Sequence, residues 1–365
     1  MSLAIAMLGS GKMARNIGMW FVRFGHRVTF FPSTEQQSEE CRLFVQKKFK
    51  RLQDLFEGSL PQPRVCLPDA AGSGAFDIVV EATVESLEIK QRRFSDLRPL
   101  MATTTLLCSA SSSILPNRIC PDCCGMHFFY PVEMNGFVEL IAGSTTPRDS
   151  MERIQSFAAS CDLEYVLENE DSAFCANRLL LPLQAEALRM IQLGCAAADV
   201  DACTISELLP LGQITLMDVV GLDVVYAGVR NYMLMLPLRE QADFEPLANV
   251  LKSAIDLGKR GHKNKNGLLP KGPLSGKTRP MDDVTRAGCA TTFLYLFVNT
   301  CCLFLEHRVI DDSALDAIVS KAFQASATVA EIIHRIGHAA IADHCNSRFL
   351  KTGISYFKPS ALLSR

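Results

Sequence analysis

The sequence has almost no net charge and no long, uninterrupted apolar run. Its 365 residues include 37 Lys and Arg against 39 Asp and Glu, so no strongly basic field is available to hold a phosphate backbone. This balance excludes nucleic acid as the main partner. The most apolar run, "ATTFLYLFVNTCCLFL" (290–305), is shorter than the roughly 18–20 residues that a membrane span requires, and Asn299 interrupts it. We expect it to form a buried helix, and we expect no membrane partner.

The chain also lacks the marks of a secreted protein. Its first residues, "MSLAIAMLGSG", contain no basic segment and break at Gly9, which indicates a strand and not a signal peptide. The 14 Cys are scattered through apolar segments at irregular spacing, which indicates reduced thiols and not a disulfide framework. Cys120 and Cys123 have C-x₂-C spacing, but a zinc site needs a second pair and none lies nearby. We therefore expect a cytoplasmic protein without a metal centre.

Short apolar runs alternate with helical patterns over the first 150 or so residues. Five runs predict strands: "LAIAMLG" (3–9), "HRVTFF" (26–31), "FDIVVEA" (76–82), "TTLLCSA" (104–110) and "GMHFFYP" (125–131). Three stretches with helical periodicity lie between them: 12–25, 34–58 and 86–101. Continuous apolar strands that alternate with helices are typical of a parallel, doubly wound sheet. This pattern predicts an α/β, Rossmann-type domain over residues 1–171.

From about residue 172 the pattern is helical, with few strand signals. Helices are predicted over 173–194, 198–209, 245–258 and 284–306. Between the last two, "GKRGHKNKNGLLPKGPLSGKTRP" (258–280) is rich in Gly, Pro and Lys and predicts a mobile linker, with a substrate-gating loop as an alternative. We therefore expect all-α domains over residues 172–280 and 281–365.

A phosphate-binding turn is predicted at the end of the first strand. "LGSGKMA" places Gly9, Gly11 and Ala14 in G-x-G-x-x-A spacing, which lets the backbone turn sharply and approach a pyrophosphate. A tight glycine turn without a ligand is the alternative. The second strand does not end in the acid that usually holds the adenosine ribose, because Pro32 and then Ser33 stand there. Ser33 is the candidate contact, to a ribose hydroxyl or to a 2′-phosphate.

One histidine lies in an aromatic run, "GMHFFYPVEMNGFVELI" (125–141). His127 and Glu139 are titratable groups in stretches that look buried, where a charge is costly unless it is paired. A neutral imidazole is a suitable general base near pH 7, and a carboxylate can fix its tautomer. The alternative is a satisfied histidine of the core.

Four stretches in order resemble the L-3-hydroxyacyl-CoA dehydrogenase family. They are "DIVVEATVESLEIKQRRFSDL", "GMHFFYPVEMNGFVELI", "FCANRLLLPLQAEALRMIQLGCAAADVD" and "PLGQITLMDVVGLDV", and the resemblance covers about residues 1–270. Residues 281–365 resemble a second, degenerate copy of the family's helical domain. This arrangement is similar to the dehydrogenase part of the multifunctional fatty-acid oxidation subunit.

The resemblance implies a role for each of several residues. His127 is the general base, Glu139 orients it, and Ser112 and Asn177 complete the polar cluster around the substrate. Without the family, Ser112 is one of a serine-rich turn and Asn177 is a helix N-cap. Glu85 and Lys90 occupy the family's cofactor-contacting positions.

The resemblance also implies substrate and partners. Lys47 and Lys48, in the basic run "QKKFKR", are implied to attract the phosphates of coenzyme A, although a solvated helix face is the plain reading. Tyr130 and Ala110 stand where the family has asparagines, and Tyr130 is the candidate for altered substrate acceptance. A second helical copy that mimics a dimer partner implies a pseudo-symmetric monomer, with a homodimer as the alternative.

The implied activity is the interconversion of L-3-hydroxyacyl-CoA and 3-ketoacyl-CoA, as in fatty-acid β-oxidation, with NAD as cofactor and NADP left open. Two alternatives remain: an acyl-CoA-binding relative without turnover, and a dehydrogenase of small hydroxy acids without CoA.

Overall fold

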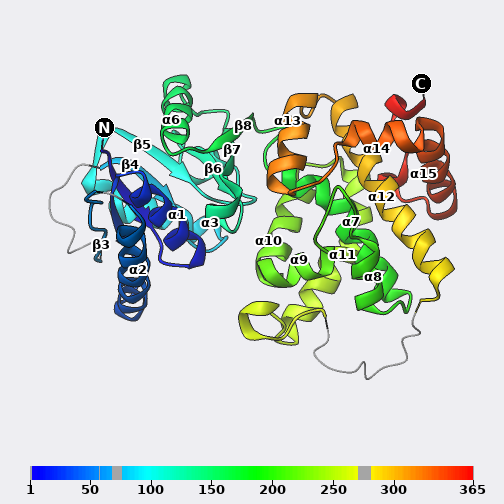
Figure 1. Ribbon diagram of the computed structural model, residues 1–365, viewed down its shortest axis with the longest axis horizontal. Coiled ribbons are helices and arrows are strands. Elements are labelled where there is room, and N and C mark those ends of the chain that lie inside the picture. The colour runs from blue at the N-terminus through cyan, green and yellow to red at the C-terminus, as the bar shows by residue number, and fades with distance from the viewer. Residues whose placement is uncertain (1, 57, 68–75, 270–280, 365) are drawn as a thin grey trace. The chain divides into compact units, whose positions relative to one another are not determined.

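The computed structural model describes residues 2–56, 58–67, 76–269 and 281–364. The chain forms two compact units, Met1–Phe174 (unit 1) and Cys175–Arg365 (unit 2) (Figure 1). Both helical segments expected from the sequence, 172–280 and 281–365, lie in unit 2 apart from residues 172–174. Their division into two domains stays a prediction.

Unit 1 is built on one eight-stranded sheet with the order β3-β2-β1-β4-β5-β6-β7-β8. The strands are β1 (Ala4–Leu8), β2 (Arg27–Phe31), β3 (Arg64–Val65), β4 (Phe76–Glu81), β5 (Met101–Ser109), β6 (Cys124–Phe128), β7 (Phe137–Ala142) and β8 (Glu164–Glu168). All neighbours are parallel except β6 and β7. The order β3-β2-β1-β4-β5-β6 is that of a dinucleotide-binding fold, so the predicted α/β class is confirmed.

Helices cover both faces of this sheet. They are α1 (Lys12–Arg23), α2 (Glu35–Leu55), α3 (Leu87–Leu97), α4 (Pro116–Ile119), α5 (Val132–Asn135) and α6 (Arg148–Ser160). Alternate residues of β1 face opposite cores: Ile5 and Met7 pack with α1, α2 and α6, whereas Ala6 and Leu8 pack with α3 and α4. This double burial explains why the strands are continuous apolar runs.

Unit 2 is helical, as predicted. Its α-helices are α7 (Cys175–Gln192), α8 (Ala197–Cys203), α9 (Gln213–Val220), α10 (Leu222–Met233), α11 (Leu238–Asp256), α12 (Asp283–Glu306), α13 (Asp312–Ala317), α14 (Val329–Ile336) and α15 (His338–Thr352). The predicted helix over 198–209 is shorter than expected, because α8 ends at Cys203. The sequence patterns did not single out α9 and α10.

The predicted linker is anchored over its described part. Leu268 and Leu269 donate their backbone N–H groups to the Asp218 carboxylate, at 2.7 and 3.0 Å. The buried Asp218 therefore ties this end of the segment to α9, so residues 258–269 are not a free linker. Residues 270–280 lie outside the described residues.

Within the described ranges, α12 is the one helix long and apolar enough to cross a membrane by length and composition. It has 24 residues and is therefore longer than the apolar run at 290–305 suggests, but half of its most apolar window is buried in the protein. It packs on α7, α8 and α15. The Asn299 side chain, fully buried, donates to the Lys358 carbonyl and accepts from the Ser360 N–H, both at 2.9 Å. A satisfied polar group of this kind is typical of a core helix.

Candidate active site

Two glycines shape the turn between β1 and α1. Gly9 has a φ of +114°, and a Cβ there would lie 2.7 Å from the Ala82 carbonyl oxygen, so only glycine fits. Gly11 is the N-cap of α1, and its missing Cβ would point into open space. The first turn of α1 has no acidic residue. Exposed backbone N–H groups at a helix N-terminus without a competing carboxylate fit the pyrophosphate of a dinucleotide.

The close packing of α1 on the sheet depends on one more glycine than the motif indicates. Ala14 is fully buried, as its place in the motif suggests. At Gly18, however, a Cβ would lie 2.4 Å from the Phe30 ring and 3.1 Å from Met7. Sequence reasoning missed Gly18, although its position four residues after Ala14 puts both on one helix face.

The end of β2 presents no carboxylate. Pro32 is buried and Ser33 is exposed. The Thr34 hydroxyl is engaged as the N-cap of α2, where it accepts from the Gln37 N–H. The Arg93 guanidinium, only 7% exposed, donates from Nη2 to the carbonyls of Phe31 and Pro32 at 2.6 and 3.3 Å. No sequence pattern pointed to Arg93, because α3 and β2 are brought together only by the fold.

Glu85 and Lys90 belong to a buried charge network behind the cofactor turn. Lys90 Nζ lies 3.0 Å from Glu81 Oε2 and 3.3 Å from Glu85 Oε2, and all three side chains are nearly inaccessible. Burial lowers the pKa of Lys90, but the charges of Glu81 and Glu85 outweigh this and hold it above its usual range. Contact of Glu85 and Lys90 with the cofactor stays a prediction; their observed partners are within unit 1.

Glu85 also holds the serine turn that follows β5. Its Oε1 accepts from the hydroxyls of Ser111 and Ser113, both at 2.7 Å, and from the Ser112 N–H at 3.1 Å. Burial raises the pKa of Glu85, but the Lys90 charge and the bonds from Ser113 and Ser111 together hold it below its usual range. Ser112 is thus part of a serine-rich turn and is also fixed in orientation by a buried carboxylate.

His127 and Glu139 are brought together by the one antiparallel step of the sheet. They face each other in the register of β6 and β7, and His127 Nδ1 lies 2.5 Å from Glu139 Oε2. Glu139 is fully buried and His127 is 6% exposed. An ionised carboxylate can only accept, so Nδ1 carries the proton and Nε2 is left as the basic nitrogen. This is the arrangement that a general base requires.

Aromatic side chains line the imidazole. The rings of Phe129 and Phe174 have their centroids 4.8 and 5.8 Å from that of His127. They limit water around the His127–Glu139 bond and thereby strengthen it.

Asn177 lies in unit 2, as the third residue of α7. Its Nδ2 donates to the Tyr232 hydroxyl at 2.9 Å. Because α7 begins at Cys175, Asn177 is inside the helix, and the N-cap alternative is wrong. Its participation in the substrate site stays a prediction.

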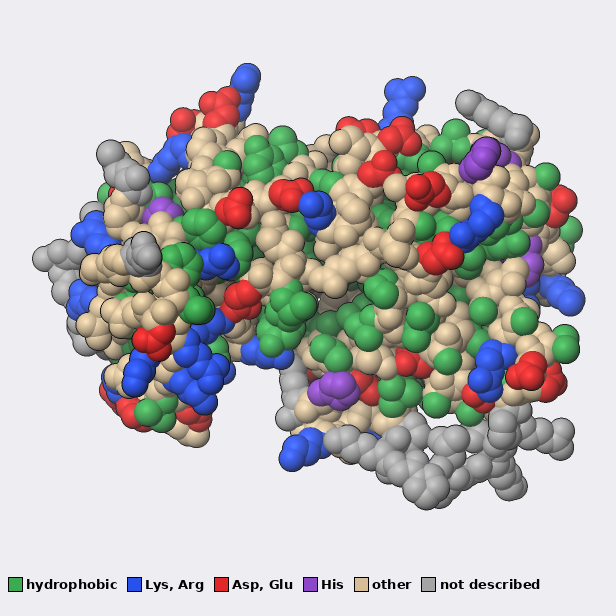
Figure 2. All heavy atoms as spheres, viewed as in Figure 1, with side chains coloured by type: hydrophobic (Ala, Val, Ile, Leu, Met, Phe, Trp, Pro, Cys, Tyr) green, Lys and Arg blue, Asp and Glu red, His purple; other side chains and the backbone are tan. Residues whose placement is uncertain are grey.

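Lys48 and Tyr130 have partners that the sequence did not indicate. Lys48 Nζ donates to Asn16 Oδ1 at 2.6 Å and is ion-paired with Glu133 on α5. The ammonium of Lys12 lies 3.6 Å from the ring centroid of Tyr130, which is 45% exposed. The pairing of Lys48 weakens the case for a free phosphate-attracting cation, whereas Lys47 is exposed. Figure 2 shows Lys and Arg side chains gathered over the part of unit 1 where α2 lies.

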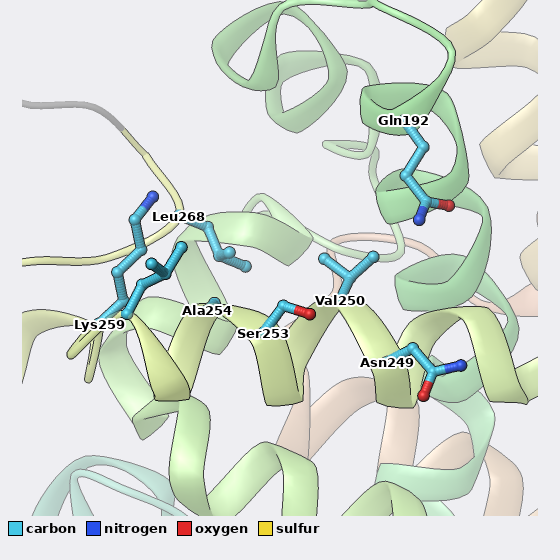
Figure 3. Close-up of a pocket in the computed structure, with 8 residues that line it drawn as sticks. Gln192, Asn249, Val250, Ser253, Ala254, Lys259 and Leu268 are labelled. Atoms are coloured by element: carbon cyan, nitrogen blue, oxygen red, sulfur yellow. The ribbon is translucent and has the colours of Figure 1, made fainter.

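An open hollow of about 420 Å³ lies in unit 2, between α11 and the end of α7 (Figure 3). Val250 and Ser253 project into it from one side of α11, and Lys259 and Leu268 border it. Among the described residues of its lining, Lys259 is the only charged one, and none is a histidine or a carboxylate. Apart from Lys259, the described lining of the hollow offers no acid–base group, so the candidate site stays with His127 and Glu139.

The Cys120 and Cys123 pair shows no sign of redox chemistry. Burial raises the pKa of the Cys123 thiol well above its usual range, which makes it a poor nucleophile and disfavours a redox role with Cys120. Across the described ranges, no three His, Cys, Asp or Glu side chains are grouped so that they could hold a metal ion.

Both parts of the chain match one sequence family. Residues 4–171 match "3-hydroxyacyl-CoA dehydrogenase, NAD binding domain", and residues 174–270 match "3-hydroxyacyl-CoA dehydrogenase, C-terminal domain". The 3-hydroxybutyryl-CoA dehydrogenase of Clostridioides difficile is 28% identical over 239 residues, which are 62% of this chain and 85% of that protein.

Solved structures share the fold. The 3-hydroxybutyryl-CoA dehydrogenase of Escherichia coli K12 is similar with a TM-score of 0.75 and 16% identity, over 100% of this chain and 98% of that one. The (S)-3-hydroxybutyryl-CoA dehydrogenase of Ralstonia eutropha gives a TM-score of 0.63 and 20% identity, over 75% of this chain and 100% of that one. The first likeness extends over residues 281–365, where neither family domain matches.

Proposed function

The chain belongs to the 3-hydroxyacyl-CoA dehydrogenase family, and from this premise we propose that His127 is the general base of its reaction and Glu139 the carboxylate that orients it. The protein is an oxidoreductase that uses NAD(H) and interconverts 3-hydroxyacyl-CoA and 3-ketoacyl-CoA. The observation that carries the assignment of roles is the 2.5 Å contact between His127 Nδ1 and Glu139 Oε2.

His127 removes the proton of the 3-hydroxyl group in the oxidation. The proton moves to Nε2 while the hydride leaves carbon 3, so the C–O bond becomes a carbonyl. Bound NAD supplies the hydride acceptor. A positioned imidazole contributes about 10²–10⁴-fold to the rate of such a step.

Glu139 stabilises the imidazolium that forms at His127. Its carboxylate is fully buried, so its attraction for the new charge is little screened by water. In the reverse direction the imidazolium returns the proton to the carbonyl oxygen.

Ser112 is proposed to hydrogen-bond the reacting oxygen of the substrate, and Asn177 to complete the polar site near the thioester. The support for Ser112 is the Glu85 carboxylate, which fixes its turn through three hydrogen bonds. The Clostridioides difficile relative is named for 3-hydroxybutyryl-CoA, so we propose a short 3-hydroxyacyl-CoA as substrate.

The test is the reduction of acetoacetyl-CoA by NADH, followed by nicotinamide absorbance. The wild-type protein should turn over, and His127→Gln should lose about 10²–10⁴ in kcat while NADH fluorescence reports unchanged binding. His26→Gln, which alters a buried histidine outside the pair, is the matched control and should keep its activity.

Two results would contradict this assignment. Unchanged turnover in His127→Gln would show that His127 is not the general base. Equal turnover of acetoacetate and its CoA thioester would show that CoA is not part of the recognised substrate.

We propose that the protein is a cytoplasmic, pseudo-symmetric monomer. Support for the monomer comes from unit 2, where α12 packs on α7 and α8 and α15 packs on α12; we propose that these helices take the place of a partner's. A sizing column with light scattering tests it, and a mass of twice 40.2 kDa would favour the homodimer instead.

A further inference from the structure

The end of β2 has a positive charge where an NAD-selective dinucleotide fold has a negative one. In such folds an Asp or Glu at this point bonds the 2′-hydroxyl of the adenosine ribose, whereas an arginine nearby accommodates a 2′-phosphate. Here the first acid along the chain is Glu35, which is exposed in the first turn of α2.

The Arg93 guanidinium binds the main chain at this point. Its Nη2 is 2.6 Å from the Phe31 carbonyl oxygen and 3.3 Å from that of Pro32. Both partners are neutral carbonyls, so they satisfy hydrogen bonds without cancelling the charge.

Burial outweighs the two carboxylates that favour that charge, Asp96 and Glu81, and holds the pKa of Arg93 below its usual range. Asp96, 38% exposed, lies 3.7 Å from Nη1, and Arg93 Nε is buried without a hydrogen-bond partner within the described residues. A guanidinium in this state, at low local dielectric, favours a nearby anion.

The side chains that follow β2 leave room for such an anion. Pro32 is buried and its side chain has no polar atom, so that side chain neither bonds a ribose hydroxyl nor repels a phosphate. Ser33 is exposed and offers a hydroxyl donor. An anion here would also meet the positive end of α2, a helix of 21 residues.

We propose that this protein accepts NADP(H) in the same site as NAD(H), with Arg93 and Ser33 as the residues that decide this acceptance. In an NAD-selective fold, one Asp or Glu at the end of the second strand both attracts the ribose hydroxyl and repels a 2′-phosphate. That acid is missing from the end of β2 here. The inference rests on the cofactor site and does not depend on the roles of His127 and Glu139.

The experiment measures binding and not turnover. Fluorescence titrations give Kd for NADH and NADPH, and calorimetry gives Kd for 5′-AMP and for adenosine 2′,5′-bisphosphate (2′,5′-ADP), which differ only in the 2′-phosphate. NADPH should bind within about tenfold of NADH. The affinity for 2′,5′-ADP should fall more steeply with salt than that for 5′-AMP. NADPH binding about 100-fold weaker than NADH or worse would overturn the proposal.

Two variants assign the residues. Ser33→Asp places a carboxylate at an exposed position and should weaken NADPH by about tenfold or more, with NADH within about threefold of wild type. Arg93→Gln should weaken NADPH selectively, whereas Arg92→Gln, at the exposed neighbouring position on α3, should change neither. If Arg93→Gln and Ser33→Asp leave the NADPH to NADH ratio unchanged, the proposal fails. Because Ser33 is exposed, its variant stays informative even if Arg93→Gln does not fold.

Discussion

Unit 1 and unit 2 each bury a glutamate completely, but the two glutamates have different partners. Glu139 in unit 1 contacts the imidazole of His127, the proposed general base. Glu186 in unit 2 accepts two bonds of 2.6 Å from Arg189, one of 2.9 Å from Arg348 and one of 3.1 Å from Tyr356.

The difference between these glutamates separates a chemical site from a structural one. Arginine does not change its protonation state, so the charges around Glu186 are constant and tie α15 and the 3₁₀ turn Ser355–Phe357 to α7. Burial of a carboxylate therefore does not indicate catalysis by itself. The kind of partner distinguishes the two sites: an imidazole at Glu139 and arginines at Glu186.

The largest effect is expected when the Glu139 carboxylate is removed. Glu139→Gln keeps the shape of the side chain but no longer stabilises the imidazolium, so kcat should fall by about 10²–10⁴. Steady-state kinetics with acetoacetyl-CoA measure this, and NADH affinity should stay unchanged. Glu152→Gln, an exposed site on α6, is the control. Wild-type kcat in Glu139→Gln would show that Glu139, like Glu186, has only a structural role.

A smaller effect, on stability alone, is expected at Glu186. Glu186→Gln leaves two partly buried arginines uncompensated and should lower the free energy of unfolding by about 3 kcal/mol. Urea denaturation measures it, while NADH affinity reports on unit 1 and should not change. Glu207→Gln removes an exposed partner of Arg335 and should cost at most about 0.5 kcal/mol. A variant with full stability but no turnover would place Glu186 in the chemistry instead.

Glu85 lies between these two cases, because its network holds a turn of the predicted site. Glu85→Gln should lower the free energy of unfolding by about 2 kcal/mol at pH 7, since charged hydrogen bonds to the serine turn are lost. The folded-state pKa of Glu85 is held below its usual range, so the stabilisation is complete above the unfolded value and is lost as pH falls through the folded one. The difference from wild type should therefore shrink below roughly pH 4. Thermal unfolding from pH 3 to pH 8 measures it, and a difference that persists unchanged at pH 3 would contradict it.

The smallest effect is expected at the exposed pair of Lys12 and Tyr130. An exposed cation–π contact contributes about 0.5–1 kcal/mol, so Tyr130→Asn should change the KM for acetoacetyl-CoA or NADH by about two- to fivefold. Tyr130→Phe keeps the ring and should behave as wild type. A large loss of kcat in Tyr130→Asn would show instead that Tyr130 takes part in the chemical step.

Much of unit 1 could be predicted because its signals are local. A strand buried on both faces must be apolar throughout, and a turn at φ +114° against the Ala82 carbonyl requires the glycine found at position 9. His127 and Glu139 were predictable as a pair from the family resemblance. Their geometry follows from the antiparallel register of β6 and β7, which the residue pattern alone did not give.

The contacts that could not be predicted join elements that are distant in sequence. Arg93 meets the Phe31 carbonyl across 62 positions, and Arg348 meets Glu186 across 162. The same holds for Lys48, which the sequence suggested as a contact for the phosphates of coenzyme A. In the structure its ammonium is ion-paired with Glu133. A single sequence carries no pattern for such pairs, because their geometry is set by how whole elements pack.

The sequence by itself determined the alternation of strands and helices in most of unit 1 and the glycine turn between β1 and α1, and the family resemblance named His127 and Glu139 as the candidate base and carboxylate. Periodicity and glycine spacing express backbone sterics and burial, which act over a few residues and can be read directly. The tertiary structure alone decided which partner each buried charge has. Glu85 binds the serine turn, Arg93 binds backbone carbonyls at the end of β2, and Glu186 in unit 2 is paired with two arginines. Charge interactions depend on distance and local dielectric, and only the folded chain sets both.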